Sequence, residues 1–84
     1  MPTICQINGI MIMMYLRNKE HNPPHVHAIY NDFEASFLIA SGDLLDGVFP
    51  SKAQAMVKSF IEVYRNELEE MWESGIYAKL PPLE

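Results

Sequence analysis

The chain has 84 residues, of which 49% are hydrophobic and 20% charged, and its formal net charge is −5. This composition excludes a disordered chain. The length predicts one domain, residues 1–84, with a thin core, because so short a chain buries only about 60–65% of its unfolded surface. Lys and Arg number 6 against 11 Asp and Glu. Direct binding to nucleic acid or to anionic membranes is therefore not expected, since both depend on excess positive charge.

The single cysteine, Cys5, excludes an internal disulfide and fits a reducing cytosol. The apolar run at residues 10–16 is too short to span a bilayer. No Lys or Arg precedes this run and no small-residue cleavage site follows it, so it does not resemble a signal peptide. We expect a cytoplasmic protein.

The first predicted elements are two strands, Thr3–Ile7 and residues 10–16, joined by the tight-turn dipeptide Asn8-Gly9. The second strand is apolar on both faces. Such a strand either lies in the centre of a sheet or covers an interface, so with the thin core it favours a homodimer or a protein partner.

A hairpin is predicted next, with His25–Tyr30 and residues 33–40 flanking Asn31-Asp32, which suit the left-handed conformation of a two-residue turn. Pairing about this turn gives one apolar face, made of Val26, Ala28, Tyr30, Phe33, Ala35 and Phe37. The opposite face then carries His25, His27, Ile29, Glu34, Ser36 and Leu38. A slip by one residue would mix the two faces, so the pattern supports this register.

Residues 44–49 predict a short strand that Asp46-Gly47 interrupts, as a β-bulge does. A helix follows over about residues 51–74, with Ser51 as N-cap, Gln54 completing a capping box and Gly75 as C-cap. Its apolar residues fall on one stripe at helical spacing: Val57, Phe60, Ile61, Tyr64, Leu68, Met71 and Trp72. Residues 75–84 are expected to be extended.

The elements together predict an α+β fold: a small antiparallel sheet of about four to five strands within residues 3–49, with one C-terminal helix on one face. The helix must bury its stripe, and the apolar face around Val26, Ala28 and Phe37 is the surface that can cover it.

All three histidines lie within seven residues, in His21-Asn22-Pro23-Pro24-His25-Val26-His27. His25 and His27 share a strand face with Cα atoms roughly 6.7 Å apart, close enough for two imidazoles to bind one ion. The prolines stiffen the loop that brings His21 near them. Glu34 lies diagonal to His27 on the neighbouring strand. These four residues predict a candidate site for a divalent metal such as zinc, facing away from the helix.

Other uses of the same residues are open. His25 and His27 can be half-exposed strand residues that hydrogen-bond Ser36, Glu34 or the backbone. The cluster can also serve acid–base catalysis or partner recognition. The sequence contains no phosphate-binding Gly-rich loop, no serine nucleophile elbow and no Cys-x-x-Cys pair.

The sequence resembles the bacterial family catalogued as domain of unknown function 4160. The matching pieces are Pro2-Thr3-Ile4, residues 12–15, His21-x-Pro23-Pro24-His25-Val26-His27-Ala28-x-Tyr30, Glu34-Ala35, Gly47 with Pro50, and Glu67-Leu68 with Trp72. The resemblance implies genes that often lie beside those of another small family, domain of unknown function 2442, in an arrangement like a toxin–antitoxin pair. It supplies no mechanism.

Two classes of function follow. The first is a protein-interaction or regulatory module, one half of such a two-gene pair. The second is a small hydrolytic or RNA-cleaving enzyme that uses His21, His25 and His27, with or without a divalent metal. The acidic charge favours the first class, and the clustering of the histidines favours the second.

Overall fold

The computed structural model describes residues 3–14, 23–76 and 78–81. These residues form, in chain order, the strands β1 (Thr3–Ile7), β2 (Ile10–Met13), β3 (His25–Tyr30), β4 (Phe33–Leu38) and β5 (Leu44–Val48), followed by the helix α1 (Ser51–Ser74). The expected α+β fold, with an antiparallel sheet and one C-terminal helix, is confirmed. The strands predicted for residues 10–16, 33–40 and 44–49 end earlier, at Met13, Leu38 and Val48; residues 15 and 16 of the first lie outside the described residues.

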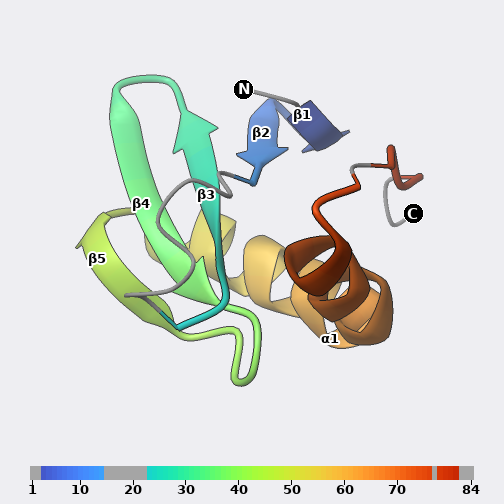
Figure 1. The fold of residues 1–84 in the computed structure, drawn as a ribbon. Coiled ribbons are helices and arrows are strands. Elements are labelled where there is room, and N and C mark those ends of the chain that lie inside the picture. Colours follow the sequence, from blue (N-terminus) through green and yellow to red (C-terminus); the bar gives the residue numbers. More distant parts are fainter. Residues whose placement is uncertain (1–2, 15–22, 77, 82–84) are drawn as a thin grey trace.

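The sheet is an antiparallel meander in the order β1-β2-β3-β4-β5. The helix crosses one face of it, and its C-terminal half lies near β1 and β2 (Figure 1). β4 ends at Leu38. The next residue, Ile39, donates its N–H to the carbonyl of Pro24. Proline has no N–H that could donate to the Ile39 carbonyl, so the ladder of hydrogen bonds between β3 and β4 stops here.

The turns set the register. Asn8 and Gly9 both have positive φ, 47° and 84°, and Asn31 has φ 54°, the left-handed conformation that these residue types tolerate. Across the second turn Tyr30 pairs with Phe33, Ala28 with Ala35 and Val26 with Phe37. The predicted hairpin register is confirmed, and the alternation of the two faces follows from it.

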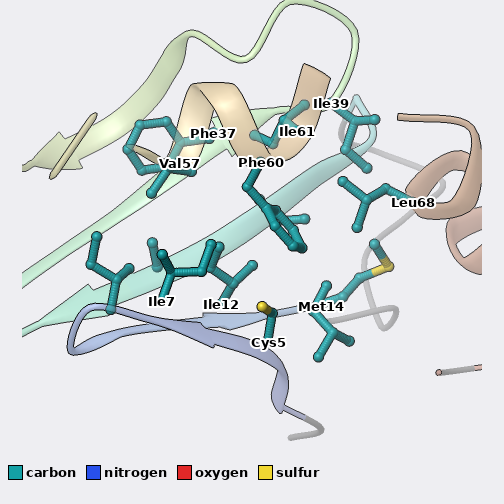
Figure 2. Close-up of a cluster of buried hydrophobic side chains, with 14 of the residues drawn as sticks. Cys5, Ile7, Ile12, Met14, Phe37, Ile39, Val57, Phe60, Ile61 and Leu68 are labelled. Atoms are coloured by element: carbon teal, nitrogen blue, oxygen red, sulfur yellow. The ribbon is translucent and has the colours of Figure 1, made fainter. Parts of the chain in front are cut away.

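The core lies between the sheet and the helix. Figure 2 shows Phe60 and Leu68 of the helix on the side of the core that faces Ile12 of β2 and Met14, which follows this strand. The helix buries most of the predicted stripe: Val57, Phe60, Ile61, Leu68, Met71 and Trp72. The thiol of Cys5 is buried in the same core, and burial raises its pKa. A thiol that stays protonated is a poor nucleophile, so Cys5 is a core residue.

The N-terminus of the helix differs from the prediction. Pro50, in extended conformation, is the N-cap, and no side chain caps the helix. The Gln54 amide donates instead to the carbonyl of Phe49, at 2.7 Å. The capping box between Ser51 and Gln54 was therefore wrong, because Ser51 already belongs to the helix. The C-cap was right: Gly75 is left-handed and its N–H donates to the Met71 carbonyl at 2.9 Å.

A β-bulge lies between β4 and β5, as expected near Asp46-Gly47. Phe37 pairs with Leu44 but Ser36 pairs with Asp46, so Leu45 is the extra residue. Gly47 has φ 95°, and a Cβ at this position would overlap the Glu34 carbonyl and lie 2.8 Å from the Ala35 Cα. Glycine is the residue that lets β5 approach β4 this closely.

The two edges of the sheet differ. Outside β1, the Leu80 N–H donates to the Ile4 carbonyl at 2.8 Å and the Leu80 side chain packs on the core, so the chain after the helix covers part of this edge. At the other edge, all five residues of β5 are exposed. Within the described residues no helix is long and apolar enough to cross a membrane.

Candidate functional site

His25 begins β3 and is held by the loop before it. Its side chain is 8% exposed, and its Nδ1 lies 2.8 Å from the Pro23 carbonyl oxygen. A carbonyl only accepts hydrogen bonds, so Nδ1 carries a proton and donates it. This bond ties the Pro23-Pro24 segment to the start of the strand, and His25 therefore has a structural role.

The ring of His25 lies between two aromatic neighbours. Its centroid is 5.1 Å from that of His27, in an edge-to-face arrangement, and 5.2 Å from that of Trp72. Trp72 belongs to the last turn of α1. His25 shares a strand face with His27, as predicted, but the end of the helix reaches its ring through Trp72, a contact that was not expected. The sequence placed Trp72 on the core stripe, but gave no sign of this contact.

His27 lies on the face opposite the core, half-buried, with Ser36 Oγ 3.3 Å from its Nδ1. Burial and the neighbouring charge of His25 lower the pKa of His27 below the ordinary 6.5, while the Glu34 carboxylate acts in the opposite direction. Glu34 pairs with Ile29 and so lies diagonal to His27, as predicted. The site favours a neutral imidazole at His27.

Of the predicted site residues, the structure places the rings of His25 and His27 side by side, with centroids 5.1 Å apart, and Glu34 diagonal to His27 on β4. His21 lies outside the described residues. Within residues 3–14, 23–76 and 78–81, no group of three or more His, Cys, Asp or Glu side chains is placed to hold a metal ion. A divalent metal at His21, His25, His27 and Glu34 stays a prediction.

Of the two places expected for the apolar strand β2, the centre of the sheet or an interface, the structure shows the first. β2 lies between β1 and β3, Met13 is buried, and Met11 is half-buried on the outer face. The apolar character of both sides of this strand is thus explained by its place in the sheet.

Exposed apolar side chains gather at β5 instead. Leu44, Leu45 and Val48 are exposed, Val48 by 69%. The sequence offered a signal for this surface, since Leu-Leu-Asp-Gly-Val contains neither Lys nor Pro, residues that protect a sheet edge. The sequence alone does not give the order of the strands, so it does not identify β5 as an edge strand. β5 is the second candidate site.

The sequence profile of the family described as Domain of unknown function (DUF4160) matches residues 9–73. The chain belongs to this family. The match includes β2 to β5, the histidine segment and nearly all of α1, so both candidate sites are parts of the family domain. No curated protein and no solved structure matches the chain.

Proposed function

We propose that this member of the family is a protein-interaction module, a regulatory half of a two-protein, toxin–antitoxin-like system. The observation that carries the proposal is the exposed edge strand β5, where Leu45 and Val48 are solvent-exposed. Exposed apolar side chains on an open sheet edge favour association with another protein.

Charge supports a protein partner over a nucleic acid. A net charge of −5 opposes contact with phosphate groups, which proteins bind mainly through Lys and Arg. A partner with basic side chains would be attracted, with a faster association at low ionic strength.

We infer that the partner is a small protein of the domain of unknown function 2442 family, encoded beside the gene of this chain. The test is to mix the two purified proteins at low micromolar concentration and to measure mass by size-exclusion chromatography with light scattering. We expect one complex containing both chains. Separate elution at the masses of the free proteins would contradict the proposal.

A second candidate is a small hydrolytic or RNA-cleaving enzyme. The observation that favours it is the histidine pair, since a neutral imidazole at His27 is the form that acts as general base or binds a metal ion. His27→Gln separates the two functions, because Gln keeps a polar side chain beside Ser36. A module keeps its partner affinity with this change, whereas an enzyme loses its cellular effect while staying folded.

A further inference from the structure

We propose that β5 is the strand onto which the partner docks, and that the occupant is an extended segment of another protein that carries a Lys or Arg between apolar side chains. This inference rests on the proposed function and deepens it, since it names the surface and the chemistry that the surface selects.

The open edge supplies the backbone part of the interaction. In the part of the chain that the structure describes, β5 has a strand neighbour on one side only, β4. The opposite edge is different, because Leu80 already donates to the Ile4 carbonyl of β1. Backbone groups on an uncovered edge are a template for a further strand, and many proteins bind peptides in this way.

The side chains of β5 favour an apolar contact. Val48 is 69% exposed and Leu45 is 43% exposed. Leu45 is the bulged residue, without a partner of its own on β4, so the bulge leaves an extra exposed apolar side chain on this strand. A strand added here would cover both residues, and removal of this apolar surface from water would stabilise the complex.

Two carboxylates beside Val48 select the charge of the occupant. Asp46 and Val48 are two residues apart and both lie on the outer face, and Glu34 of β4 pairs with Val48. The Asp46 carboxylate accepts a hydrogen bond from the Gly47 N–H at 3.0 Å, and Glu34 acts electrostatically on His27. Asp43, before β5, differs from both because it forms an ion pair with the Lys58 ammonium group, at 3.1 Å. A Lys or Arg of the docking segment can approach both carboxylates, and opposite charges across paired strands are favourable.

A second copy of the chain fits this edge poorly. Asp46 is the middle residue of β5, so antiparallel pairing of two β5 strands about a two-fold axis at their centre would set the two Asp46 side chains against each other. Like charges directly opposite in a sheet are destabilising, and each copy also has a net charge of −5. The charges therefore favour a basic segment of a different protein.

The test uses two short peptides, one of alternating Val and Lys and one of alternating Val and Glu, titrated into the isotopically labelled chain. We expect the basic peptide to shift the amide NMR signals of β5, with an affinity at least about tenfold above that of the acidic peptide. In Asp46→Lys the preference should weaken or reverse. Asp46 is exposed, so the spectrum of this variant should keep the dispersion of a folded protein.

Shifts that avoid β5, equal affinity for the two peptides, or no shift with either peptide would overturn the inference. A homodimer formed through β5 would also overturn it. The proposed function is judged separately by the mass of the mixture with the partner protein. If that complex forms without any change at the β5 amides, the function stands and the docking strand is wrong.

Discussion

At the scale of single residues, His27 and His25 have different surroundings although they are two residues apart on one strand. His25 is buried and bonded to the Pro23 carbonyl. His27 is half-buried beside Ser36, on the outer face. The pKa of His27 is lowered, first by burial and then by His25. His27 therefore presents a ring with a lowered pKa to the outer face.

The lowered pKa of His27 predicts a loss of stability at mildly acid pH. Below about pH 6.5 His27 is protonated in the unfolded chain but stays neutral in the folded chain, because its folded pKa is lower. The free energy of unfolding therefore falls as the pH falls toward the folded pKa. The Glu34 carboxylate raises the pKa of His27 and so makes this pH dependence of stability smaller. It does not reverse it, because the net shift of the His27 pKa is downward. Urea unfolding between about pH 7.5 and pH 5.5 measures the effect.

The matched variant is His27→Gln, which cannot titrate. We expect its stability to fall less than that of the unaltered chain over the same pH range, since the carboxylates and the other histidines are the same in both proteins. Equal losses in the two proteins would show that His27 does not contribute, and that its ring titrates as an ordinary surface histidine does.

At the scale of elements, the approach of β5 to β4 depends on Gly47, and Gly9 provides the control. Both glycines have positive φ, but a Cβ at Gly9 would meet only the Tyr30 ring, at 3.6 Å, whereas at Gly47 it would meet the backbone of β4. Gly9→Ala should cost about 1–2 kcal/mol from backbone strain alone. Gly47→Ala should cost roughly 1–3 kcal/mol more, because the backbone must shift.

Thermal and urea unfolding of the two glycine variants test this prediction. Similar stabilities would mean that β5 is not held close to β4 at Gly47, and that the bulge tolerates a side chain there.

The helix holds the sheet through its buried stripe. Leu68 is fully buried, so Leu68→Ala should lower the free energy of unfolding by about 2–5 kcal/mol through lost burial and a cavity. Val63 lies on the same helix but is 59% exposed, and Val63→Ala should change stability by less than about 0.5 kcal/mol. Urea unfolding of both variants measures the difference; a loss below about 1 kcal/mol for Leu68→Ala would place the stripe outside the core.

The sequence predicted most elements because their signals are local. Alternating apolar residues and Asn31-Asp32 determined the hairpin register, and the stripe with Gly75 determined the helix. The contact of Trp72 with His25 joins residues far apart in the chain, so no local sequence pattern predicts it. The cap at Pro50 was missed because Ser51 and Gln54 satisfy the capping-box pattern, although Gln54 bonds Phe49 instead.

At the scale of the whole molecule, the fold uses its two faces and two edges differently. One face of the sheet is covered by α1, and the edge at β1 is met by the chain after the helix (Figure 1). The edge at β5 carries exposed Leu45 and Val48 next to the carboxylates of Glu34 and Asp46. A small domain buries little apolar surface by itself, and it buries more when a partner covers such an edge. The small size of the domain is therefore consistent with the proposed interaction.

The most direct test of this account is a calorimetric titration of the small partner protein into the chain and into two variants, Val48→Lys and Val63→Lys. Both place a Lys at an exposed valine, 69% and 59% exposed, but Val48 lies on the docking edge and Val63 on the helix. We expect Val48→Lys to weaken binding about tenfold or more and Val63→Lys to leave it within about twofold. Equal affinities for the two variants would contradict the account.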